Sequence, residues 1–197
     1  MPPLNDVKLG PLTRTIIDNA VWAASSYFPG NQGWADEFER ILTFLESQGQ
    51  FKQFYKRLCA KERDGALAEA RAGFYFHRNG FQILKWEPEV VPGIPGDIEI
   101  SWYDTEALFL EVKNPGWEGE LLEEEIKAGR TKLSKYLSAD SRAVDPFERV
   151  MYVVGKSLPK FHNSRVNLVV VVDNLFVSPL EMPTDIVFSR LLKNVFS

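Results

Sequence analysis

In the N-terminal part of the chain, apolar side chains recur at the spacing of one helix face. Leu12, Ile16 and Ala24 mark the first predicted helix, which ends before the break at Pro29. The pattern continues up to Gly80, where glycine provides the backbone freedom that commonly stops a helix. It predicts further helices near residues 34–48, 51–62 and 64–79.

Beyond Gly80 the pattern changes to that of strands. Residues 97–102 alternate polar and apolar side chains, as in a half-buried strand. Residues 107–113 predict a second strand, and a turn near Asp104 joins the two strands as a hairpin. The other predicted elements are strands at 81–90, 150–154 and 167–172 and helices at 120–137 and 184–194.

Helices followed by a strand, a hairpin, a helix and two further strands predict a mixed α/β or α+β fold. The length of 197 residues suits one domain with a helical extension. We therefore expect a helical N-terminal extension at residues 1–62 and a mixed α/β core at residues 63–197.

The composition excludes several kinds of site. Cys59 is the only cysteine, and His77 and His162 are the only histidines, so no disulfide within the chain and no multi-thiolate zinc site can form. A metal site must consist mainly of carboxylate and carbonyl oxygens, which favour Mg²⁺, Mn²⁺ or Ca²⁺. The net charge of −4 argues against a polybasic nucleic-acid binder, but it leaves room for a local basic groove.

Nothing in the sequence indicates a membrane or an export pathway. The N-terminus has no basic stretch followed by an apolar run, as a secretory signal would. The longest apolar stretch, near residues 168–172, is far too short to span a bilayer. With a single cysteine as well, these features predict a cytoplasmic protein without membrane contact.

The residues with the clearest chemical meaning lie on the predicted hairpin. Glu111 and Lys113 are two residues apart, so both side chains leave the same face of a strand. If the turn centres on Asp104, Asp97 on the preceding strand faces Glu111 directly, whereas a slip of one residue would move Asp97 to the opposite face.

Two converging carboxylates repel each other and raise each other's pKa unless a cation lies between them. A divalent metal ion removes this conflict and stabilises negative charge on a phosphoryl oxygen. A neighbouring lysine such as Lys113 can orient the nucleophile or neutralise the same charge. These residue types therefore suit hydrolysis of a phosphodiester.

The string Pro95-Gly96-Asp97, followed by Glu111-Val112-Lys113 after an apolar run, resembles the PD-(D/E)xK nuclease superfamily. The resemblance implies a restriction-endonuclease-like fold, in which a mixed β-sheet core is flanked by helices, and cleavage of DNA or RNA with Mg²⁺ or Mn²⁺. It departs from the common pattern in that Gly96 stands where a proline usually precedes the aspartate.

The resemblance also implies roles for individual residues. Asp97, Glu111 and the carbonyl of Val112 would bind the metal, and Lys113 would position or polarise the attacking water. Glu69, on the helix before the core sheet, would hold a second metal or an outer water. The remaining implied positions are a reserve ligand, Glu99, and nucleic-acid contacts at Arg130, Lys132 and Lys135 on the helix after the motif.

Simpler interpretations exist for each of these residues alone. Glu69 is of a type that usually lies on a solvated surface, and Glu111 with Lys113 would make an ordinary ion pair on one strand face. An E-x-K triplet also occurs by chance in many proteins. The combination with the alternating strand around Asp97 carries more weight than any single residue.

The leading hypothesis is a Mg²⁺- or Mn²⁺-dependent nuclease that acts on nucleic acid, with DNA favoured over RNA. One alternative is a catalytically inactive module of the same fold that binds nucleic acid or a protein partner. Another is a hydrolase of nucleotides or other small phosphate esters. A second copy of the chain or a protein partner would dock on the helical N-terminus.

Overall fold

The structure is a computed structural model, and it describes six segments of the chain. These segments are residues 7–20, 32–60, 63–102, 106–114, 146–161 and 166–172. The predicted turn at Asp104 and the predicted helices at 120–137 and 184–194 lie outside the described residues.

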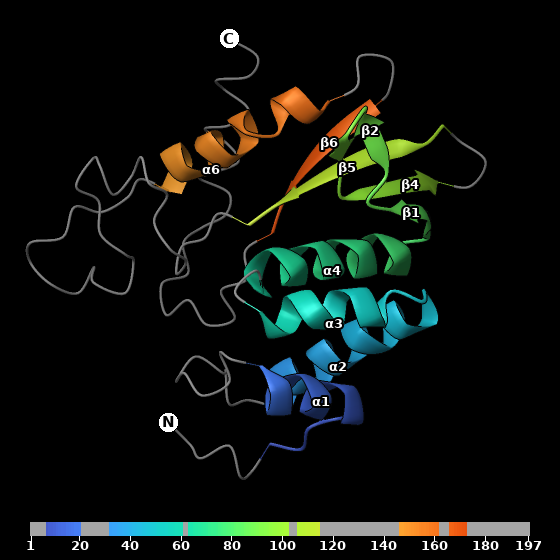
Figure 1. The fold of residues 1–197 in the computed structure, drawn as a ribbon, viewed down its shortest axis with the longest axis vertical. Coiled ribbons are helices and arrows are strands. Elements are labelled where there is room, and N and C mark those ends of the chain that lie inside the picture. The colour runs from blue at the N-terminus through green and yellow to red at the C-terminus, as the bar shows by residue number, and fades with distance from the viewer. Residues whose placement is uncertain are drawn as a thin grey trace, which may run out of the picture.

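Four helices succeed one another at the N-terminal end, as the apolar periodicity predicts. They are α1 (Pro11–Asn19), α2 (Gln32–Ser47), α3 (Phe51–Cys59) and α4 (Arg63–Arg78). Figure 1 shows them stacked in a layer below the sheet, with α4 nearest to the strands. This layer confirms the predicted order of helices.

The strands form one mixed sheet and a small two-stranded ribbon. The sheet has the order β1-β4-β5-β6, in which the first two pairings are antiparallel and the last is parallel. Its strands are β1 (Phe81–Trp86), β4 (Ile98–Trp102), β5 (Leu108–Lys113) and β6 (Val166–Val171), and the ribbon joins β2 (Glu89–Val91) to β3 (Ile94–Pro95). The described segments thus form a mixed α/β protein.

Residues 146–155 form a helix, α6 (Pro146–Gly155), so the predicted strand at 150–154 is wrong. Val150 and Val153 are buried, and Ser157 is buried one turn later, which is the spacing of one helix face. Pro146 at the start suits a helix, because its fixed backbone angle matches the first turn. A run of five mainly β-branched residues is too short to distinguish the period of a helix from that of a strand. Tertiary packing therefore decides which of the two forms.

The N-terminus of α1 is capped from α2. Glu39 accepts the backbone N–H of Leu12 at 3.2 Å through Oε1 and that of Thr13 at 2.7 Å through Oε2. A carboxylate at this end of a helix satisfies orphan N–H groups and complements the helix dipole. The absence of a side chain at Gly10 allows the carboxylate to come this close, because a Cβ there would lie 2.2 Å from the Cδ of Glu39.

Two apolar cores share the helix α4. Ala66, Leu67 and Ala70 face the core between the N-terminal helices, whereas Ala68 and Ala72 face the core beneath the sheet. Trp86, at the end of β1, packs against both cores. Its ring lies 5.1 Å from that of Phe54 on α3, centroid to centroid. The helical layer and the sheet are therefore packed together through α4 and Trp86.

None of the helices in the described ranges combines the length and the apolar character that crossing a lipid bilayer requires.

Gly73 lets the ring of Trp86 approach α4 closely. A Cβ at Gly73 would lie 2.3 Å from Cη2 of Trp86, whereas a Cβ at Gly65 on the same helix would meet nothing within 4 Å. We expect Gly73→Ala to lower the free energy of unfolding by about 1–3 kcal/mol, because the added methyl group would overlap the half-buried ring of Trp86. Gly65→Ala should raise it by up to about 1 kcal/mol, because alanine is the better helix former.

Urea unfolding of the two variants beside the wild type measures this difference. Equal effects of the two substitutions would contradict the close approach of Trp86 to α4.

Candidate active site

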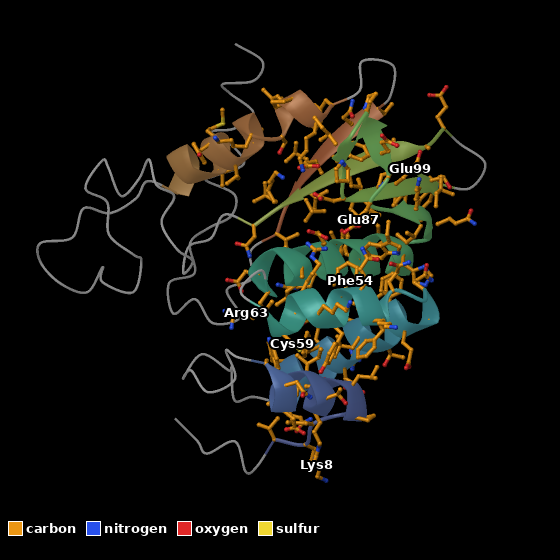
Figure 2. All side chains as sticks on the ribbon, viewed as in Figure 1. Lys8, Phe54, Cys59, Arg63, Glu87 and Glu99 are labelled. Carbon is orange, nitrogen blue, oxygen red and sulfur yellow. The ribbon has the colours of Figure 1, made fainter. Side chains whose placement is uncertain are left out.

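A closed backbone loop fixes the position of Asp97. The chain leaves β1 at Glu87, forms the β2–β3 ribbon, and returns through Asp97. The N–H of Glu87 donates to the carbonyl of Asp97 at 2.9 Å, and that of Gly96 donates to the carbonyl of Pro88 at 2.8 Å. Glu87 has a φ of 48°, a left-handed conformation that is unusual for a residue with a side chain. Figure 2 shows this residue between the helical layer and the sheet.

The hairpin register places Asp97 opposite Glu111, as predicted. Ile98 pairs with Leu110, and each later pair follows in the same register. Extending this register by one residue brings Asp97 beside Glu111. The Oδ2 atom of Asp97 also accepts the backbone N–H of Val112 at 2.5 Å, which ties the carboxylate to the adjacent strand.

Glu111 is a fully buried carboxylate, with 0% of its surface exposed. Its Oε1 atom accepts from the ammonium groups of Lys113 and Lys160, the latter at 2.6 Å. Its Oε2 atom is also buried and has no hydrogen-bond partner among the described residues. Burying a carboxylate oxygen without a partner is costly, so this atom is suited to a ligand.

Lys160 belongs to this site, although the sequence reasoning did not find it. It ends the short 3₁₀ helix η4 (Leu158–Lys160), which follows α6. Since side chains alternate along β5, Glu111 and Lys113 leave the face opposite to Leu110 and Val112, which pack towards α4. Figure 1 shows α6 on the side of the sheet away from α4. The dipeptide Asp145-Pro146 is a helix-start signal that could have placed this segment.

Glu69 lies on α4 and is engaged by a helix of the N-terminal layer. Nη1 of Arg57 on α3 donates to its Oε2 at 2.6 Å, and Nη2 donates to its Oε1 at 2.5 Å. A forked pair of this kind is strong and geometrically specific. Nη1 of Arg57 also lies 3.6 Å from Oε1 of Glu87. Both carboxylate oxygens of Glu69 are thus bound by Arg57, so the predicted role of Glu69 at a metal site would have to coexist with this ion pair.

The neighbouring acidic groups act on the protonation of Asp97. Burial, followed by the charges of Glu111 and Glu69, raises the pKa of Asp97 from 3.8 to about 7, although the Val112 N–H and Lys113 oppose the shift. Burial works to lower the pKa of Lys160, but its hydrogen bond to Glu111 and the charge of Glu111 together raise it. The structure thus concentrates negative charge where Asp97 meets Glu111.

Asp97 and Glu111 fit a hard divalent cation. The partnerless Oε2 of Glu111 and the raised pKa of Asp97 both indicate negative charge that lacks compensation. Among the described residues, no three His, Cys, Asp or Glu side chains form a group that could hold a metal ion. Two carboxylates suffice for Mg²⁺, which keeps several waters and also binds substrate phosphates. The carbonyl of Val112 is the further protein oxygen that the sequence predicts.

Two groups of predicted positions remain, on β4 and on the predicted helix after the motif. Glu99 is half-buried on β4, where it pairs with Phe109 of β5 and Lys85 of β1. The predicted nucleic-acid contacts Arg130, Lys132 and Lys135 fall outside the described residues. The structure therefore brings together Asp97, Glu111, Lys113 and the additional Lys160.

No protein-family model matches the chain, and comparisons with curated proteins and with solved structures also give no match.

The raised pKa of Asp97 predicts how stability depends on pH without metal. Between pH 3.8 and about 7 the folded protein binds more protons here than the unfolded chain. Stability is therefore greatest below this range and falls as pH rises through about 7. Asp97→Asn removes this dependence, so the variant should gain on the order of 4 kcal/mol relative to the wild type from acid to neutral pH.

Urea unfolding of both proteins at several pH values, in EDTA, measures this change. A stability difference that stays constant across the range would contradict the raised pKa of Asp97.

Proposed function

We propose that the protein is a metal-dependent nuclease that hydrolyses phosphodiester bonds of nucleic acid, with DNA favoured over RNA. The observation that carries the proposal is the buried Glu111, whose Oε2 atom has no partner in the described part of the chain, together with Asp97, whose pKa the charge of Glu111 helps to raise. Two carboxylates and a lysine on adjacent strands suit phosphodiester hydrolysis.

The architecture is compatible with the proposal at the level of fold. A mixed sheet flanked by helices on two sides is what a restriction-endonuclease-like fold requires, and the described segments have such a sheet. In this assignment β4 and β5 carry the motif residues, and α4 carries Glu69. The helices α1 to α3 are an addition to that core.

Asp97 and Glu111 would hold Mg²⁺ or Mn²⁺, together with the carbonyl of Val112. When bound, the cation supplies Lewis-acid stabilisation of the charge that develops on the phosphoryl oxygens. Glu111 contributes the oxygen that has no partner, so its bonds to Lys113 and Lys160 through the other oxygen need not break. Burial of Glu111 excludes water from one side of the site.

Lys113 and Lys160 bring positive charge to one end of the carboxylate pair. Lys113 lies on the same strand face as Glu111, next to the position where a phosphate would meet the metal ligands. Its ammonium group would orient the attacking water or neutralise the pentacovalent anion. Lys160 holds Glu111 in place through its bond to Oε1.

Asp97→Asn tests the proposal without loss of the fold, because asparagine keeps an oxygen for the Val112 N–H. We expect cleavage of DNA with Mg²⁺ or Mn²⁺ to fall by about a hundredfold or more. Lys113→Met should have a similar effect. Glu106→Gln removes an exposed carboxylate near the same hairpin and should leave the rate within about twofold of the wild type.

Plasmid DNA, single-stranded DNA and RNA, each with metal and with EDTA, are the substrates for this assay. Absence of cleavage in every case, or an Asp97→Asn variant as active as the wild type, would exclude the nuclease proposal.

A second candidate is a catalytically inactive module of the same fold. It is favoured by the ion pairs at the site, where Lys113 and Lys160 bind Glu111 and Arg57 binds Glu69. These cations offset much of the negative charge without a metal. Calorimetric titration of the folded protein with Mn²⁺ separates the two candidates, because binding that Asp97→Asn abolishes favours the nuclease and no binding favours the module.

A further inference from the structure

A cavity lies on one flank of α4, and none of its lining residues belongs to the site of Asp97 and Glu111. It has a volume of about 810 Å³, within the range of small-molecule sites, and it lies between α2, the C-terminal half of α4 and the end of β6. Arg71, Tyr75 and Arg78 reach it from α4 at the spacing of one helix stripe. Glu69 and Gly73 lie on the opposite flank of the same helix, because each is two residues from Arg71, and a step of two residues turns a side chain to nearly the opposite face of a helix.

The cavity carries an excess of positive charge. Arg40 from α2 lines it together with Arg71 and Arg78, and Glu37 is its one acidic lining residue in the described part of the chain. Only Arg71 approaches Glu37, with 3.5 Å between Nη2 and Oε1. Three guanidinium groups therefore face one carboxylate, in a protein whose overall charge is −4.

Arg40 and Arg78 are the groups best placed to take a ligand. Both are exposed, and neither has an acidic partner among the described residues. The guanidinium of Arg78 lies over the ring of Phe74, 5.6 Å from its centroid, which holds the side chain beside the cavity. Clustered like charges repel one another, and an anion in the cavity would relieve that repulsion.

The chemistry of the lining identifies the anion. Guanidinium groups bind phosphate oxygens through paired hydrogen bonds, which makes arginine the preferred residue for phosphate recognition. Tyr75 is 63% exposed at the same cavity and offers an aromatic face on which a base can stack. A phosphate group with an attached base satisfies both features.

We propose that this cavity is a binding site for the phosphate of a nucleotide unit, separate from the carboxylate pair of Asp97 and Glu111. Arg40, Arg71 and Arg78 bind the phosphate oxygens, and Tyr75 contacts the base. The choice of a nucleotide rests on the proposed function, whereas the preference for phosphate follows from the arginines alone. The unit belongs either to a nucleic-acid strand or to a free nucleotide.

The double substitution Arg40→Gln/Arg78→Gln tests the site, because both side chains are exposed and the helices should remain folded. The matched control is Lys8→Gln/Arg14→Gln, which removes the same charge at the N-terminal end of the helical layer, where Figure 2 labels Lys8. Binding of a short labelled single-stranded DNA is measured in EDTA, so that a metal at Asp97 and Glu111 cannot contribute.

We expect the Kd to rise about tenfold or more for Arg40→Gln/Arg78→Gln and less than about twofold for the control. The slope of log K against log salt should fall by about 1.4 for two lost phosphate contacts. Equal effects of the two double variants, or no binding by the wild-type protein, would overturn the inference.

Competition with dAMP and with pyrophosphate identifies the source of the phosphate. Displacement of the DNA by dAMP indicates a free nucleotide, and resistance to both competitors indicates a strand. Displacement by pyrophosphate but not by dAMP would overturn the role of the base. Failure of the nuclease assay leaves this binding result unaffected, so the two proposals fail separately.

Discussion

A carboxylate that is withdrawn from water costs several kilocalories per mole unless cations or hydrogen-bond donors surround it. Glu111 is withdrawn completely, and the surrounding elements are arranged to compensate it. Lys113 reaches it along its own strand, and Lys160 reaches it from the segment after α6. The ion pair between Lys160 and Glu111 thereby joins η4 to the sheet. The remaining oxygen of Glu111 has no partner among the described residues, and together with Asp97 it defines the candidate site.

The hairpin and its register followed from the sequence because they depend on local pattern. The alternation around Ile98 and the apolar run before Glu111 each specify a strand, and the face that each strand buries limits how the two can pair. The contact between Lys160 and Glu111 could not be predicted in this way, since it depends on how a distant segment packs. The helix at Val150 escaped prediction for a related reason, because packing overrode the preference of valine for strands.

The role of the N-terminal helices was also inaccessible from the sequence. Arg57 belongs to a stretch of basic residues that would suit a surface facing phosphates. The structure instead directs its guanidinium to Glu69 and towards Glu87, so it contributes to the electrostatics of the candidate site. Which surface charge pairs with which depends on the angle between α3 and α4. That angle depends on how buried side chains of the two helices pack together, such as Phe54 and Leu58 on α3 with Leu67 on α4.

The close approach of Trp86 to Gly73 has a consequence for cooperativity. One ring contributes to both apolar cores, so neither core can lose its packing without exposing part of the other. Removal of the helices before residue 63 would expose the apolar face of α4 at Leu67 and Ala70 to solvent. We therefore expect the helical layer and the sheet to unfold together. The helices α1 to α3 are accordingly a structural part of the protein that carries the candidate site, and not a detachable appendage.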